Sequence, residues 1–138
     1  MFLVQMKAAL IGTGKTGSKV QEALELEQNA LFNTSRPPTV DALRVYDVVF
    51  VFVPGDVFLE MIPTLLSAQI AVVSGATGAA IPDSVKTQIL HGKRPWLIAQ
   101  NFSPAMQMIQ QALKWIGDHP DWLEESEFSL HEVHHQQK

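Results

Sequence analysis

Runs of consecutive apolar residues alternate along this chain with stretches in which apolar residues recur at helical spacing. The runs are typical of buried strands and occur at residues 7–11, 48–53, 70–73 and 96–99, with a shorter strand predicted at 30–33. The helical spacing predicts amphipathic helices between the strands. Because strands that alternate with helices form parallel βαβ units, we predict an α/β fold: a Rossmann-type doubly wound parallel sheet.

Helical patterns follow the first strand and cover residues 39–43, 57–66, 82–90 and 104–116. Pro63 lies inside one of these patterns and predicts a kink or a late start of that helix. Ser103 and Pro104 suit the N-cap and first position of the last helix. The apolar residues of that helix, which we expect to be buried, are Met108, Ile109, Ala112, Leu113 and Ile116.

The first strand ends in a glycine-rich turn, Gly12-Thr13-Gly14-Lys15-Thr16-Gly17, from which a helix begins. Three glycines at this spacing between a strand and a helix are the fingerprint of dinucleotide binding. Gly12 permits a tight turn, Gly14 lets the main chain approach a diphosphate, and Gly17 lets helix and strand pack closely. The helix start also offers unpaired N–H groups and a partial positive charge. The alternative is a structural turn that binds no ligand.

Residues 33–36, Asn33-Thr34-Ser35-Arg36, stand where NAD-specific sites usually carry an acidic residue that binds the ribose hydroxyls. Small hydroxyls and an arginine suit a 2′-phosphate instead, through charge-assisted hydrogen bonds. We therefore predict NADPH rather than NADH as the cofactor, with Ser35 and Arg36 at that phosphate. The alternative is a solvated arginine before a proline turn.

Composition and charge exclude several classes of protein. The chain has no cysteine, which removes disulfides, thiolate catalysis and cysteine-ligated zinc. The net charge is −4 and the ten Lys and Arg are scattered along the sequence, which argues against a nucleic-acid partner. No apolar run is long enough to cross a membrane, and the first residues do not resemble a signal peptide, so we expect a cytoplasmic protein.

Three further segments, read together with the glycine-rich turn, resemble the dihydrodipicolinate reductase family. They are Gly75-Ala76-Thr77-Gly78, Ala99-Gln100-Asn101-Phe102-Ser103 and Glu132-Val133-His134-His135-Gln136-Gln137-Lys138. They correspond in order and spacing to the family's G-T-T-G, A-N-F-S and E-x-H-H-x-x-K motifs. The resemblance covers essentially the whole chain, although Ala76 replaces a Thr and Gln136 stands where an Arg is frequent.

The resemblance implies reduction of the dihydrodipicolinate-type intermediate of lysine and diaminopimelate biosynthesis with NADPH or NADH. It places Gly12, Gly14 and Gly17, with Thr13, Lys15 and Thr16, around the diphosphate. It also places a second group near the nicotinamide and its ribose: Gly75, Thr77, Gly78, Ala99, Asn101 and Phe102.

In the same resemblance, His134 is the general acid that protonates the substrate as hydride arrives. Lys138 assists as a cationic donor, and His135 contacts a carboxylate of the dicarboxylate substrate. A histidine that titrates near neutrality suits this role, because hydride delivery builds electron density that a nearby proton must neutralise. The alternatives at these positions are solvated histidines of a tail, or a metal cluster with His131 and Glu132. Adjacent residues of a strand point to opposite faces, which argues against the metal.

We assign residues 1–102 to the nucleotide-binding domain, and 103–138 to a connecting helix and first strand of an incomplete substrate domain. The family's D-x-P-S-G-T segment and tetramer-forming sheet would follow Lys138. We therefore expect a fragment that retains cofactor binding without measurable turnover, and a homo-oligomer in the complete family member. The alternative function is a non-catalytic NAD(P)-binding module with a sensing or regulatory role.

Overall fold

The computed structural model describes residues 6–119, 121, 129 and 131. The chain divides into two compact units, Met1–Asn101 and Phe102–Lys138. The first unit contains the whole sheet and, in the described part of the chain, every α-helix except the last.

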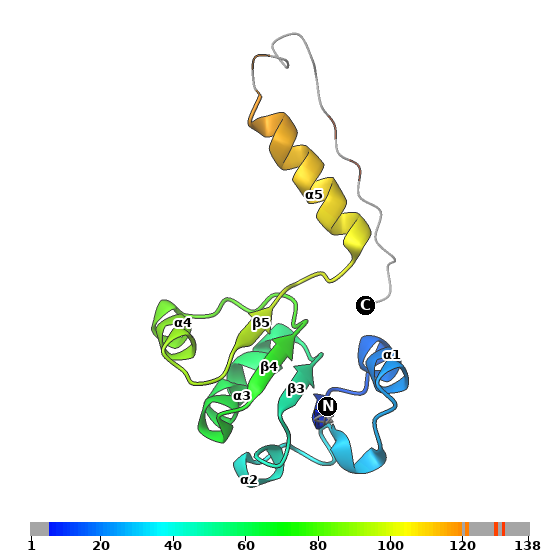
Figure 1. Cartoon of the computed structure of the whole chain (residues 1–138), viewed down its shortest axis with the longest axis vertical. Coiled ribbons are helices and arrows are strands. Elements are labelled where there is room, and N and C mark those ends of the chain that lie inside the picture. The colour runs from blue at the N-terminus through cyan, green and yellow to red at the C-terminus, as the bar shows by residue number, and fades with distance from the viewer. Residues whose placement is uncertain (1–5, 120, 122–128, 130, 132–138) are drawn as a thin grey trace, which may run out of the picture. The chain divides into compact units, whose positions relative to one another are not determined.

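Five parallel strands form one sheet in the order β2-β1-β3-β4-β5 (Figure 1). Their bounds are β1 Ala8–Ile11, β2 Leu31–Phe32, β3 Val48–Val51, β4 Ala71–Ser74 and β5 Trp96–Ile98. The strands alternate with helices, which confirms the predicted α/β fold of Rossmann-like, doubly wound type. From β1 the chain turns first to β2 and then returns past β1 to β3, so the topological switch point lies between β1 and β3.

Four α-helices and a short 3₁₀ helix connect the strands. They are α1 Lys15–Ala23, the 3₁₀ helix Gln28–Ala30, α2 Val40–Leu43, α3 Gly55–Ala68 and α4 Asp83–Leu90. The predicted late start of the helix at Pro63 is wrong, because α3 begins at Gly55 and contains the proline. The buried Phe58 and Ile62 precede Pro63, and burying two such side chains outweighs the loss of one helical hydrogen bond.

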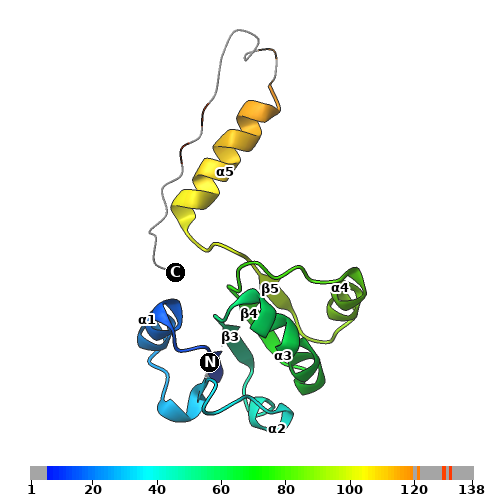
Figure 2. The ribbon, with the colours of Figure 1, turned by 180° about the vertical axis from the view of Figure 1, so that it is seen from behind.

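One face of the sheet carries the main hydrophobic core. Ala9 is registered with Val49, and Val49 with Val72, so these three side chains share a face. They belong to one buried cluster with α2 and α3, and Figures 1 and 2 both show α3 beside β4. The helix residues in the cluster are Leu43, Phe58, Ile62, Leu65 and Ala68.

The opposite face is covered unevenly. Leu10, Phe50, Val73 and Leu97 form one registered row across β1, β3, β4 and β5. Leu10 is fully buried beside Gly17 of α1, Phe50 and Val73 are half-buried, and Leu97 is 56% exposed. Among the residues that the structure describes, cover on this face therefore decreases toward β5. The apolar run 48–53 is typical of a buried strand, but Phe50 within it is only half-buried.

The second unit contains α5, Pro104–Gly117, at the predicted position with Ser103 as its N-cap. The prediction that its apolar face is buried is wrong for the structure described. No residue of α5 is buried, and Met108 is 73% exposed. Helical spacing marks side chains that favour burial, but burial also requires a second packed element. None of the helices in the described part of the chain is long and apolar enough to cross a membrane.

Candidate functional site

The turns that follow the strands lie at one edge of the sheet, because the carboxyl ends of parallel strands lie together. Just past β1, β3, β4 and β5, a main-chain N–H donates to the carbonyl of a neighbouring strand. These pairs are Gly12 to Phe32, Phe52 to Ile11, Gly75 to Val51 and Ala99 to Ser74, with N···O distances of 2.9, 2.9, 3.0 and 3.0 Å. The three predicted segments of the first unit thus meet at the edge where α/β proteins bind ligands.

Gly12 is required by the turn itself. Its φ is +96°, a left-handed conformation that is unfavourable for residues with a side chain. A Cβ atom at this position would also overlap the carbonyl oxygen of Phe52 and lie 2.9 Å from Cγ1 of Val53. The first glycine therefore allows the turn after β1 to pass directly against the turn after β3.

Gly17 is required by packing. It is the only buried residue of α1. A Cβ atom here would overlap the carbonyl oxygen of Gly12 and lie 3.8 Å from Cδ2 of Leu10. The third glycine therefore lets α1 lie directly on the end of β1, as the fingerprint requires.

Gly14 differs from both of these glycines. A Cβ atom at Gly14 would meet no atom within 4 Å, and its φ of −73° is available to any residue. Gly14 is the N-cap of α1 without a side-chain cap, and no described group accepts from the N–H groups of Lys15, Thr16 or Gly17. The second glycine therefore leaves open space beside unpaired N–H donors.

Ser18, which sequence reasoning missed, closes the turn from the other side. Its Oγ lies 3.1 Å from the carbonyl oxygen of Thr13 and 3.0 Å from that of Gly14. These contacts engage both carbonyl groups of the turn with a side chain of α1. A serine one position after the third glycine is the only sequence signal for this role.

The carboxyl end of β2 holds the predicted Ser35 and Arg36. Oδ1 of Asn33 accepts from the N–H groups of Ser35 and Arg36, at 2.9 and 3.0 Å. The Arg36 guanidinium donates from Nη1 to the carbonyl of Gln28 at 3.1 Å, and its Cζ lies 5.0 Å from the Phe32 ring centroid. Arg36 is exposed but anchored, so its remaining donors point from a fixed position at the strand end.

The turn after β4 crosses the start of α3. Gly78 has a φ of +79° with no atom within 4 Å of a built Cβ, and Thr77 is exposed. A Cβ at Gly55 would instead lie 2.5 Å from the Ala79 nitrogen, so Gly55 is needed for this crossing. Sequence reasoning missed Gly55, although its position directly after β3 and Pro54 was a usable signal.

The remaining predicted residues are placed less completely. Ala99 is half-buried at the end of β5, and Asn101 is exposed. Phe102 begins the second unit and is 44% exposed. His134, His135 and Lys138 lie outside the described residues, so the predicted proton donor and substrate contacts stay predictions.

Charge at the glycine-rich turn favours an anion. Residues 12–19 contain no Asp or Glu, while Lys15 and Lys19 are both exposed. Open space at Gly14, unpaired helix N–H groups and the anchored Arg36 fit a diphosphate with a further phosphate on its ribose. No protein-family model matches the chain.

Proposed function

We propose that this chain binds NADPH, and NADH more weakly, across the carboxyl edge of its sheet. The observation that carries the proposal is the contrast within one turn. Gly12 and Gly17 are crowded by main-chain atoms, whereas Gly14 faces open space. A purely structural turn needs only the first two. The open space at Gly14, the second glycine, gives a diphosphate close access to the N–H groups at the start of α1.

The preference for NADPH rests on the end of β2. Arg36 is held there by Gln28 and Phe32, and residues 33–36 include no carboxylate. A carboxylate would repel a 2′-phosphate, whereas a guanidinium binds it through charge-assisted hydrogen bonds. Arg36 is therefore assigned to the 2′-phosphate, with Ser35 beside it.

We extend the proposal to a reaction of the dihydrodipicolinate reductase type, supported by the sequence motifs alone. When bound, NADPH supplies a hydride. His134 would protonate the reduced substrate, while Lys138 and His135 would bind its carboxylates. The Gly75–Gly78 and Ala99–Asn101 turns would border the nicotinamide end.

The direct test is calorimetric titration of the folded chain with NADPH, NADH and FMN. FMN is included because the order β2-β1-β3-β4-β5 also occurs in folds that bind FMN at the β1/β3 switch point. Binding of NADPH and NADH in the micromolar range, with no heat from FMN, supports a dinucleotide site. Binding of FMN alone, or of none of the three to a chain with native circular dichroism, would contradict the proposal.

A second titration separates the reductase from a non-catalytic module. A pyridine dicarboxylate, a flat analogue of the substrate, is added to the chain saturated with NADPH. Binding that is lost in Lys138→Gln but retained in Lys114→Gln supports the reductase. Equal binding by both variants, or none by the parent chain, removes support for the substrate assignment and favours a sensing or regulatory NAD(P) module.

A further inference from the structure

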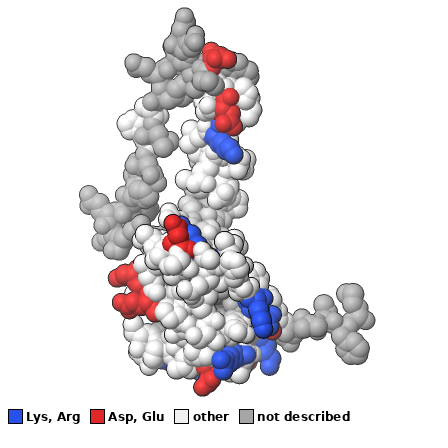
Figure 3. Space-filling model, turned by 90° about the vertical axis from the view of Figure 1, so that its left-hand side faces the viewer, with Lys and Arg blue, Asp and Glu red and all other residues white. Residues whose placement is uncertain are grey.

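Three basic side chains gather at the opposite edge of the sheet, near the amino ends of β4 and β5. Arg44 follows α2, and Lys93 and Arg94 lie between α4 and β5. With Tyr46, Ala68 and Gln69 they line an open hollow of about 530 Å³. Figure 3 shows basic side chains gathered on one side of the face that it draws. Three of the ten basic residues therefore lie close together in space, although Arg44 is far from Lys93 and Arg94 in the sequence.

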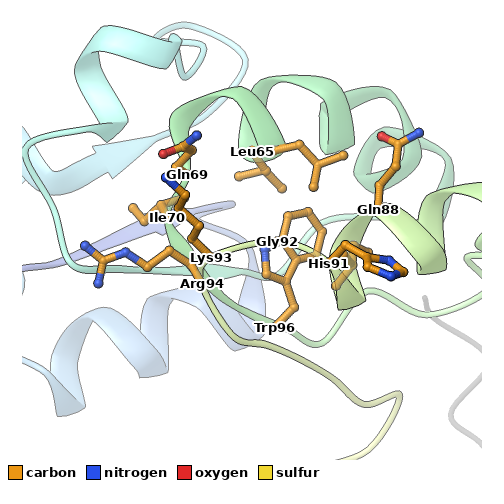
Figure 4. Close-up of a pocket in the computed structure, with 11 residues that line it drawn as sticks. Leu65, Gln69, Ile70, Gln88, His91, Gly92, Lys93, Arg94 and Trp96 are labelled. Carbon is orange, nitrogen blue, oxygen red and sulfur yellow. The ribbon is translucent and has the colours of Figure 1, made fainter.

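A second hollow of about 310 Å³ adjoins the first and shares Gln69, Lys93 and Arg94 with it. Figure 4 shows Trp96 at its centre, across from Leu65. The apolar residues that line it come from α3, α4, β5 and the position just before β4: Leu65, Leu66, Ile70, Ile89 and Trp96. A half-buried indole thus lies beside two exposed cations, in a lining without any acidic residue.

Most of this positive charge is not neutralised. Arg44 pairs with Asp41 at 3.5 Å and donates to the carbonyl of Ser67 at 3.3 Å. Lys93 and Arg94 make no hydrogen bond or ion pair with any residue in the described part of the chain. Holding like charges near one another is unfavourable unless an anion is present.

The ends of α3 and α4 offer a competing explanation. Both helices end beside the hollow, at Gln69 and His91, and cations near helix C-termini are stabilising. This explains why basic residues are tolerated there. It does not explain why an indole and apolar side chains remain accessible next to them.

We propose that the two hollows form one binding site for a small organic phosphate with a flat apolar body. The phosphate would lie between Lys93 and Arg94, and the ring would contact Trp96. A phosphate monoester carries about −1.5 to −2 charge at neutral pH, which matches the charge of Lys93 and Arg94, two cations that have no partner among the described residues. This site lies at the other edge of the sheet from the proposed dinucleotide site and does not depend on it.

The test uses phenyl phosphate as the probe and nuclear magnetic resonance of the indole N–H groups as the readout, with Trp96 assigned through Trp96→Phe. We expect phenyl phosphate to shift the Trp96 signal saturably and to leave Trp115 unchanged. Inorganic phosphate, which lacks the ring, should bind at least about tenfold more weakly than phenyl phosphate. Benzyl alcohol, which lacks the phosphate, should also bind at least about tenfold more weakly. Equal affinity for all three probes, or no shift of Trp96, would overturn the proposal.

Charge variants separate binding from helix stabilisation. Lys93→Gln with Arg94→Gln should weaken phenyl phosphate at least about tenfold, because both charge-assisted contacts are lost. The control is Lys19→Gln with Lys114→Gln, which changes the net charge by the same amount. Neither lysine lines a hollow, so the control should bind phenyl phosphate like the parent chain. If the first pair lowers the unfolding midpoint but leaves the affinity unchanged, the cations serve only the helix ends and the site is rejected. Gly14→Ala should not affect this affinity, so failure here is distinct from failure of the dinucleotide site.

Discussion

The two edges of the sheet offer positive charge to ligands in different ways. At the carboxyl edge, the donors proposed for the diphosphate are main-chain N–H groups at the start of α1, beside Gly14 and held by the crowded turn of Gly12 and Gly17, and Arg36 is assigned only to the 2′-phosphate. At the amino edge, the donors are the long, exposed side chains of Lys93 and Arg94. The first arrangement is fixed before any ligand arrives, whereas the second must lose side-chain freedom on binding.

This difference indicates how far binding at each edge depends on the fold. A main-chain site can be lost only when the turn changes or the open space is filled. A side-chain site can be lost by removing charge, with the fold intact. Variants that fill space and variants that remove charge should therefore affect the two edges differently.

The largest effect is expected from Gly17→Ala. The new Cβ would overlap the Gly12 carbonyl oxygen, which belongs to the main chain and can move only if α1 shifts from β1. We expect a loss of about 2–4 kcal/mol in the free energy of unfolding, measured by urea denaturation. A midpoint equal to that of the parent chain would show that the close packing of α1 on β1 is not needed.

The next largest effect is expected from Arg36→Ala, which should lower the affinity for NADPH and leave that for NADH almost unchanged. Loss of the guanidinium should weaken NADPH by about tenfold, or about 1.4 kcal/mol, and change NADH by less than about twofold. Calorimetry with both cofactors measures the difference. Equal loss for NADPH and NADH would mean that Arg36 supports the turn at Asn33 and does not contact the 2′-phosphate.

Added salt should weaken binding at the two edges to different extents, with a smaller effect than that of Arg36→Ala on NADPH. Raising ionic strength from about 0.05 to about 0.5 M screens exposed side-chain charges, so phenyl phosphate should weaken at least about threefold. NADH should weaken less, since fixed N–H donors contribute hydrogen bonds as well as charge. The opposite order of salt dependence would contradict the assignment of main-chain donors to one edge and side-chain donors to the other.

The smallest effect is expected on the first turn of α4, which begins with Asp83. The hydrogen bond and charge of Lys86, with Nζ 2.7 Å from Oδ1 of Asp83, hold the pKa of this carboxyl below its usual value. The pair's stabilisation is therefore present above the usual pKa and is lost as pH falls through the lowered pKa. Because both side chains are exposed to solvent, the contribution of the pair should be slight.

Lys86→Gln should return the pKa of Asp83 toward its ordinary range, as measured by carboxyl resonances during a pH titration. Lys114→Gln is the matched control and should leave that pKa unchanged. A pKa of Asp83 that does not respond to Lys86→Gln would assign the shift to the helix start instead of the ion pair.

The sequence predicted the sheet and the three turns of its carboxyl edge well. Local pattern was sufficient there, because apolar runs such as residues 48–53 and glycine spacing are properties of adjacent residues. Gly12 and Gly17 have the surroundings that the fingerprint requires, and Gly14 has the open space.

The sequence could not predict features that depend on which elements meet. Leu97 and Met108 have the spacing of buried residues but remain exposed, since periodicity does not identify a packing partner. The hollow at the amino edge combines Arg44 with Lys93, which are far apart in sequence and are joined by the pairing of β3, β4 and β5. Gly55 likewise becomes significant only when the Thr77–Ala79 turn crosses it.

The measurement that tests the central claim most directly is NADPH affinity in Gly14→Ala, compared with Gly117→Ala. Both positions have open space around a built Cβ, so both variants should fold with unfolding free energies within about 1 kcal/mol of the parent. We predict that Gly14→Ala weakens NADPH at least about tenfold, because its methyl group occupies the approach to the α1 N–H groups, while Gly117→Ala binds like the parent. Undiminished NADPH affinity in a folded Gly14→Ala chain would contradict the account.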